Sequence, residues 1–322
     1  MPLSQIEQLI KDVLKGDRRS IAKTISLIEN DMPEAQKVVS LLYRHIGKAH
    51  IIGVTGPLGS GKSTLIEKVA KEIRKGKKTI GIVAVDPTSP FSGGAFLGDR
   101  VRMQDLSTDE GVFIRSMATR GNMGGIAKAT KDAVNVLDAS GKDVIIVETV
   151  GAGQTEVDVI KIAQTIVVVL APGLGDEIQA IKAGIMEIGD IFVVNKADLE
   201  NVDKAVGAIE AMLEMNTQKK DWKPTVVTTI ATVGEGITEL VEKINQHKAY
   251  LDSGAIHAQS RQRIEIELEE AVKRKLTEVI LDKLKRREEF HELVDKILAK
   301  ETDPYSAADV LLEGKLKKYK ND

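Results

Sequence analysis

The chain has no cysteine among its 322 residues, which excludes disulfide bridges and thiolate metal sites and is typical of a reducing compartment. Aromatic residues make up only 3% of it, too few for an extended platform of stacked nucleic-acid bases. The 46 basic and 48 acidic residues nearly cancel, so no strong field attracts nucleic acid or an anionic membrane. No apolar run approaches the length of a membrane span, and the N-terminal stretch lacks the apolar core of a secretory signal. We therefore expect a cytoplasmic protein that partners neither nucleic acid nor membrane.

The pattern of apolar residues changes twice along the chain. Residues 3–47 carry apolar positions at helical spacing. From about 50 to 250, short aliphatic runs alternate with amphipathic segments: "HIIGVTG", "TIGIVAVD", "VFIRS", "DVIIVE", "TIVVVLAP", "DIFVVNK" and "PTVVTTIA". Strands that are covered on both faces need such nearly continuous runs. We predict a doubly wound, mostly parallel α/β sheet at 49–252, a helical extension at 1–48 and a helical arm at 253–322.

The C-terminal arm carries a long apolar stripe. The spacing places six apolar residues on one helical face: Ile264, Leu268, Val272, Leu276, Val279 and Leu284. A stripe of this length needs a covering surface, so we predict a homodimer in which 253–322 is the dimerisation arm.

The stretch "GVTGPLGSGKST" fits the P-loop pattern G-x-x-x-x-G-K-S between a predicted strand and a predicted helix. Glycines let backbone N–H groups turn inward around phosphate, and the helix N-terminus adds partial positive charge. Lys62 is expected to contact the β- and γ-phosphates, and Ser63 to ligate Mg²⁺. The predicted nucleotide-binding residues of this loop are Gly56, Gly59, Ser60, Gly61, Lys62, Ser63 and Thr64.

Carboxylates follow other predicted strands at the same edge of the sheet, because the carboxyl ends of parallel strands line one crevice. Glu148, Asp86 and Asp99 are predicted members of the Mg²⁺ environment, and Glu148 would act through a bound water. The alternative for each is a helix cap or a solvated turn. Gly151 can bring a backbone N–H close to the γ-phosphate and allow a switch, and Gln154 either orients water or supports the switch fold.

The stretch "VVNKAD" predicts guanine as the base. The carboxylate of Asp198 can accept hydrogen bonds from guanine N1–H and N2–H, while the Lys196 stem covers the base and Asn195 braces the loop. Adenine offers no matching donor pair, so ATP is expected to bind poorly. A second base-contacting loop is predicted at Thr229, Ile230 and Ala231.

Together, "GPLGSGKST", "VDPTSPFSGGAFLGDRVRM", "FIRSMATRGNMGG", "ETVGAGQTEVDV", "PGLGDEIQAIKAGIMEIGD" and "VVNKAD" resemble the MeaB/ArgK-type GTPases of the SIMIBI class. The resemblance implies a G protein that protects, reactivates and gates cofactor loading of an adenosylcobalamin-dependent acyl-CoA mutase, such as methylmalonyl-CoA mutase. It implies slow GTP hydrolysis that the partner stimulates, with Lys62, Glu148 and Gln154 in catalysis. Lys182 would transmit the nucleotide state to the mutase, although Asp176, Glu177 and Lys182 also fit an ordinary solvated helix face.

Three alternatives remain. A nickel-insertion GTPase would share the fold but usually carries a metal-binding His/Cys cluster, and the five scattered histidines indicate no imidazole cluster. An ATPase or kinase serving basic amino-acid transport conflicts with the guanine element. A nucleotide-binding module without hydrolysis remains open, because no residue is an evident general base.

Overall fold

The structure is a computed structural model that describes residues 1–86, 103–118, 123–149, 162–173, 188–215, 222–285 and 288–316. Its contacts divide the chain into two compact units, Met1–Ser253 and Gly254–Asp322. Among the described residues, no helix combines the length and the apolar character that crossing a membrane requires.

The first unit is built on one sheet of seven strands in the order β3-β2-β4-β1-β5-β6-β7. Every neighbouring pair is parallel. The strands are β1 (His50–Thr55), β2 (Ile80–Asp86), β3 (Val112–Ala118), β4 (Val144–Glu148), β5 (Thr165–Leu170), β6 (Ile191–Asn195) and β7 (Thr225–Thr229). Each predicted aliphatic run forms one strand, which confirms the doubly wound parallel sheet.

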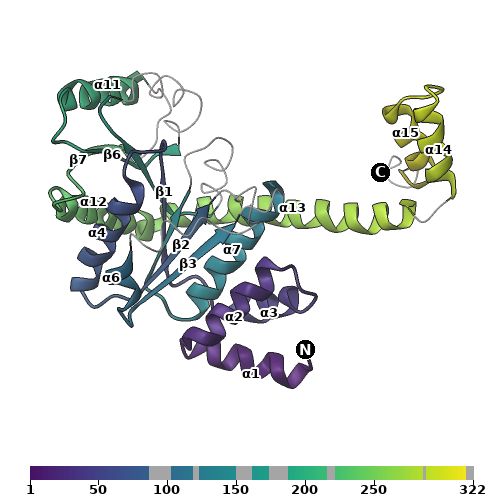
Figure 1. The fold of residues 1–322 in the computed structure, drawn as a ribbon, viewed down its shortest axis with the longest axis horizontal. Helices are drawn as coiled ribbons and strands as arrows, with labels where there is room; N and C mark the ends of the chain where they lie inside the picture. The colour runs from purple at the N-terminus through teal and green to yellow at the C-terminus, as the bar shows by residue number, and fades with distance from the viewer. Residues whose placement is uncertain are drawn as a thin grey trace. The chain divides into compact units, whose positions relative to one another are not determined.

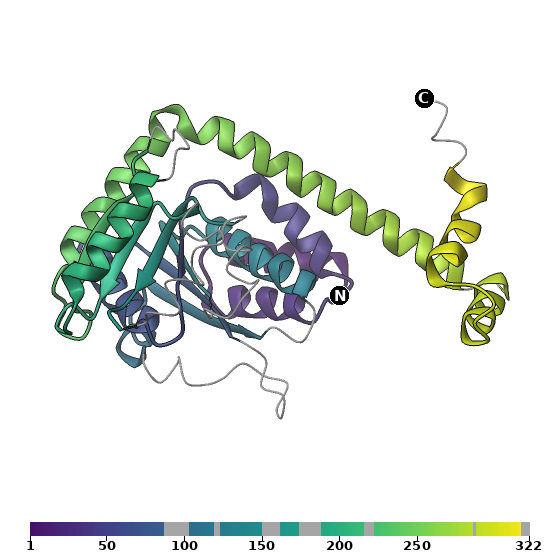
Figure 2. The ribbon, with the colours of Figure 1, turned by 90° about the horizontal axis from the view of Figure 1, so that it is seen from above.

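Helices cover both faces of this sheet, as Figures 1 and 2 show. Successive strand residues point to opposite faces: Val83 and Val85 pack into one core, and Ile80 and Ile82 pack into the other. The second core is closed by α4 (Lys62–Lys75), α6 (Gln104–Ser107) and α12 (Ile237–Tyr250). The first is closed by α7 (Met123–Ala139), α11 (Val202–Met215) and the N-terminal helices.

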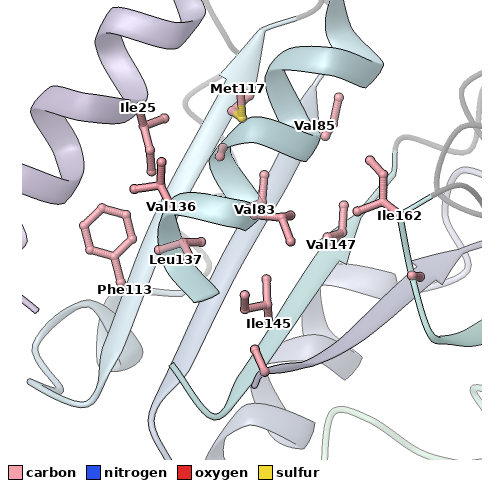
Figure 3. Packing of buried hydrophobic residues seen from close by; sticks show 14 of the residues in the cluster. Ile25, Val83, Val85, Phe113, Met117, Val136, Leu137, Ile145, Val147 and Ile162 are labelled. Atoms are coloured by element: carbon pink, nitrogen blue, oxygen red, sulfur yellow. The ribbon is translucent and has the colours of Figure 1, made fainter. Parts of the chain in front are cut away.

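The N-terminal helices share the first core with α7 and do not form a core of their own. They are α1 (Leu3–Leu14), α2 (Arg18–Glu29) and α3 (Ala35–Leu42). Figure 3 shows Ile25 of α2 beside Val136 of α7, and both belong to the same cluster as the strand residues Val83 and Phe113. Arg18 Nη1 donates to the Val112 carbonyl oxygen at 2.6 Å, and Arg115 of β3 forms an ion pair with Glu29. Apolar packing and these two arginines therefore hold the extension against the sheet.

Two histidines that are far apart in the sequence meet at the amino ends of β1 and β5. His50 Nε2 lies 2.7 Å from Thr165 Oγ1, which lies 2.8 Å from His247 Nδ1. All three residues are buried. Burial is the main cause that lowers the pKa of each histidine from 6.5 to about 4, so both rings are neutral at neutral pH. The sequence did not reveal this contact, because the sheet joins residues with no sequence proximity.

The second unit consists of α13 (Ile256–Lys285), α14 (Glu288–Leu298) and α15 (Pro304–Leu316). On α13 the predicted apolar stripe is largely exposed, and Leu268 is 63% accessible. The exception is Leu284, which is buried. Within the described residues of its own unit, most of the stripe is therefore left uncovered.

Candidate nucleotide-binding site

The P-loop connects the end of β1 to the start of α4 and approaches neighbouring strands too closely for side chains at two positions. Gly56 has φ 139°, and a Cβ there would overlap the carbonyl oxygen of Val169 in β5. Gly61 has φ 89°, and a Cβ there would collide with the Asn195 amide. Glycine is therefore required at both positions by conformation and by space. The loop delivers the N-terminus of a 14-residue helix, a position that favours phosphate groups.

The polar residues that follow the P-loop meet the end of β4. Lys62 Nζ donates to the carbonyl oxygens of Gly56 and Pro57 at 2.7 and 2.9 Å, which holds the buried ammonium group over the loop. Ser63 Oγ donates to Glu148 Oε1 at 2.7 Å. The Glu148 side chain is only 5% exposed, because β4 lies between β1 and β2 in the sheet. Ser63 and Glu148, both predicted to take part in the Mg²⁺ site, are thus in direct contact.

The Asn195 side chain joins the P-loop to the end of β7. Its Nδ2 donates to the Ser60 carbonyl oxygen at 2.8 Å. Its Oδ1 accepts from Thr229 Oγ1 at 3.0 Å and from the Ala231 backbone N–H at 3.1 Å. Asn195 and its three partners are all buried. One amide therefore fixes the loop expected to hold phosphates relative to the loop expected to hold the base.

The Asn-Lys-x-Asp turn leaves β6 at the same edge of the sheet. Lys196 has φ 61°, a conformation that turns the chain sharply after the strand. The Ala197 N–H donates to the Thr229 carbonyl oxygen at 3.0 Å, so both base loops are joined through the backbone as well. Lys196 and Asp198 are exposed beside the buried Asn195, which leaves both side chains accessible to a base.

Comparison with known proteins assigns this arrangement to a family. The model described as "Methylmalonyl Co-A mutase-associated GTPase MeaB" matches residues 21–285. The chain belongs to this family. A putative GTPase of Pyrococcus horikoshii is 51% identical to it over 316 residues, covering 97% of this chain and 98% of the relative.

Two further likenesses extend over nearly the whole chain. The mouse protein "Methylmalonic aciduria type A homolog, mitochondrial" is 31% identical over 328 residues, covering 96% of this chain and 79% of the relative. The crystal structure of an LAO/AO transport system kinase is 25% identical, with a TM-score of 0.74, and covers 97% of this chain and 98% of that one. The fold is therefore that of a P-loop GTPase.

Membership of the MeaB family and the names of its relatives identify the chain as a GTPase, which converts GTP and water to GDP and phosphate. The site geometry agrees with this chemistry, because a P-loop lysine, a helix N-terminus and a buried carboxylate lie together at the carboxyl ends of β1 and β4. Binding of GTP and GDP follows from the same family membership.

Several predicted residues lie where the structure gives partial or no information. Asp99, Gly151, Gln154 and Lys182 are outside the described residues. Asp86 ends β2 next to β4, but only its backbone is described. Of the other P-loop residues, Gly59 has φ 79° and Thr64 lies in the first turn of α4.

Two contacts that build the site could not be predicted from the sequence. Thr149, directly after Glu148, has its Oγ1 3.0 Å from Thr55 Oγ1 at the end of β1. Ser60 contributes its backbone carbonyl to the contact with Asn195, so its residue type did not indicate that role. Both contacts join residues far apart in the chain, and only the strand order brings them together.

Proposed function

We propose that this chain uses its GTP and GDP states to protect, reactivate and gate cofactor loading of an adenosylcobalamin-dependent acyl-CoA mutase in the cytoplasm. The observation that carries the proposal is the match over residues 21–285 to a family whose description is mutase-associated. GTP hydrolysis at the nucleotide site converts the GTP state into the GDP state. A GTPase changes the state of a partner only if its GTP and GDP forms bind that partner with different affinity.

The residues at the end of β4 and the start of α4 fit a Mg²⁺ ion. Mg²⁺ prefers oxygen ligands and usually keeps several waters. The Ser63 hydroxyl and the buried Glu148 carboxylate, 2.7 Å apart, form an oxygen-rich pair at the phosphate end of the site. In this proposal Ser63 ligates the ion, Glu148 holds it through water, and Asp86 and Asp99 complete its surroundings. The ion would neutralise charge on the phosphates.

We expect slow intrinsic hydrolysis. The Glu148 carboxylate already accepts a hydrogen bond from Ser63 and is assigned to the ion, so it is not free to act as a general base. In this proposal Gln154 orients the attacking water, Gly151 follows the γ-phosphate, and Lys182 passes the nucleotide state to the mutase. The partner then accelerates turnover by completing the site, as activators do for other GTPases.

The test is to mix the protein with the cobalamin-dependent mutases of its own cell and to measure GTP turnover and nucleotide affinity with and without each. The binding coupling is reciprocal, so a mutase that prefers the GTP form must raise GTP affinity relative to GDP. Lys182→Ala should retain nucleotide binding and lose the coupling, and the exposed Lys37→Ala serves as the matched control. No change in turnover or affinity with any of those mutases would reject the chaperone function.

We propose further that residues 253–322 are a dimerisation arm. The support is the exposed apolar stripe of α13, which includes Leu268 and Leu276. The double variant Leu268→Glu and Leu276→Glu should give a monomer in light scattering at micromolar concentration, whereas the wild type gives a dimer. Thr277→Glu adds a charge off the stripe and should leave the dimer intact. A monomeric wild-type protein would exclude this role for the arm.

A further inference from the structure

A cavity of about 330 Å³ lies at the amino ends of β1 and β4, between α4 and α12. The P-loop follows the carboxyl end of β1, so this cavity is at the opposite edge of the sheet from the nucleotide site. Its volume lies at the lower end of the range of small-molecule sites in proteins. Nothing in the GTPase reaction makes use of it.

The inner wall of the cavity is apolar. Ile52 of β1, Ile73 of α4, Val144 of β4 and Ile244 of α12 are buried side chains that line it, and Val241 adds a partly buried one. These residues come from four elements of the second core, which fixes their positions by packing. The wall therefore suits the short apolar body of a ligand.

The rim of the cavity carries three lysines: Lys48, Lys78 and Lys248. Lys248 forms an ion pair with Asp252, but neither Lys48 nor Lys78 has an ion-pair partner in the described part of the chain. The two acidic residues of the lining already have partners of their own. Glu72 pairs with Lys75, and Asp143 accepts from the Thr79 N–H and hydroxyl. Asp143 keeps its negative charge, because both of its donors are neutral, so Lys48 and Lys78 together with Asp143 leave one net positive charge at the rim beside the two ion pairs.

The backbone that carries these lysines is held in place before any ligand arrives. The buried carboxylate of Asp138 accepts from the N–H groups of Gly47, Lys48 and Ala49 at 2.6, 3.1 and 3.0 Å. Arg74 Nη1 donates to the Lys78 carbonyl oxygen at 2.8 Å. Because this backbone is already fixed, ligand binding has to order only the lysine side chains.

The cavity also has a buried polar group. His50 is 3% exposed and lines the cavity, and its Nε2 is engaged by Thr165. Its other ring nitrogen, Nδ1, has no hydrogen-bond partner within the described ranges. Burial is the main cause that lowers the pKa of His50, Lys248, His247 and Lys78 add to it, and Asp252 opposes it.

From these features we propose that the cavity is a second ligand site, which binds a small organic anion through Lys48 and Lys78 and holds its short apolar body against the Ile52–Ile244 wall. The head group is a carboxylate or a phosphate, since both pair with ammonium groups. His50 and Asn245 offer hydrogen bonds to the same ligand. None of the residues that line this site belongs to the predicted nucleotide site, and it lies at the opposite edge of the sheet.

The test is calorimetric titration of the whole protein with its P-loop saturated by GDP and Mg²⁺, so that added phosphate groups cannot enter the nucleotide site. The probes are hexanoate, hexyl phosphate, inorganic phosphate and hexylamine. Saturable binding of one or both hexyl anions, with weaker binding of inorganic phosphate and none of hexylamine, supports the site. The two anions also decide between the carboxylate and phosphate head groups.

The double variant Lys48→Gln and Lys78→Gln should weaken binding of the better anion roughly tenfold or more, because two facing charges are lost. The matched control is Lys37→Gln with Lys243→Gln, which removes the same charge from positions that do not line the cavity. In the wild type, the bound anion should also raise the pKa of His50 in an NMR titration of its ring signals. Absence of saturable binding by either hexyl anion, or equal weakening by the two double variants, would overturn the proposal.

Discussion

Replacing Asn195 with alanine is expected to damage both stability and nucleotide binding, because this one amide holds two loops together. The substitution leaves the Ser60 carbonyl, the Thr229 hydroxyl and the Ala231 N–H without their shared partner. All three residues are buried, so bulk water cannot replace the lost bonds without opening the structure.

The size of the effect follows from the number of abandoned partners. A buried group left unsatisfied costs about 1–3 kcal/mol, and a water that enters the vacated space recovers part of this. We expect Asn195→Ala to lower the free energy of unfolding by about 2–4 kcal/mol, a large share of the roughly 5–15 kcal/mol of a typical domain. GDP affinity should also fall by about tenfold or more, because phosphate and base loops are no longer held in one arrangement.

The measurements are urea unfolding without nucleotide and calorimetric titration with GDP. Asn30→Ala is the matched control, since it removes an exposed asparagine whose side-chain amide donates to the Ser26 carbonyl. Asn195→Asp adds a second check: its carboxylate faces the Ser60 carbonyl oxygen, and only the protonated acid can donate to it. The pKa of that acid should therefore be raised, so the variant regains stability relative to wild type as pH falls. If Asn195→Ala matches Asn30→Ala within about 0.5 kcal/mol and binds GDP normally, our account of this amide is wrong.

Three further predictions concern the base, the metal and pH. Asp198→Asn should weaken GTP by about 10- to 100-fold and favour xanthosine nucleotides in competition titrations, and unchanged preference for guanine would contradict the base assignment. Glu148→Ala should slow Mg²⁺-dependent hydrolysis by about 10- to 100-fold and leave Mg²⁺-free GDP binding intact. If the variant and the wild type hydrolyse GTP at the same rate, Glu148 has only a structural role. Burial lowers the pKa of His50 from 6.5, its value in the unfolded chain, to about 4 in the folded protein. The neutral buried ring therefore contributes its full stability above the unfolded pKa, and this contribution is lost as pH falls toward the folded pKa. Urea unfolding should show a loss of about 2 kcal/mol from this residue between about pH 7 and pH 5, with His247 adding to it, and a His50→Gln variant should show a smaller loss.

The sheet could be predicted from the sequence because strands that are buried on both faces need nearly continuous apolar runs, which are visible in the sequence. In β5 every residue is buried, and the run "TIVVVL" is correspondingly apolar without alternation. The P-loop was also predictable, since its glycines and lysine serve one local turn. The partner surface of the N-terminal helices was not, because an apolar stripe shows that a face is covered and does not show by what. Ile6 and Ile25 could have packed on any apolar helix, and the fold places them with α7.

The candidate site was predictable to the extent that its chemistry lies in local motifs. Lys62, Ser63 and Asn195 were each found from their immediate neighbours in sequence. The contact from Asn195 to the Ser60 carbonyl was not, because a backbone acceptor carries no residue preference and the pair is 135 residues apart. The meeting of His50 and His247 through Thr165 was missed for the same reason.

The strand order has a consequence for how the protein is made. The neighbours of β1 in the sheet are β4 and β5, and the Ser60 carbonyl of the P-loop meets its partner 135 residues later in the chain. On a ribosome the P-loop sequence therefore emerges long before the strands that support it, and the nascent chain must wait for β6 and β7 before its nucleotide site can close. GTP or GDP then binds only the nearly complete unit, so cellular nucleotide stabilises a late folding product and gives no help to early intermediates.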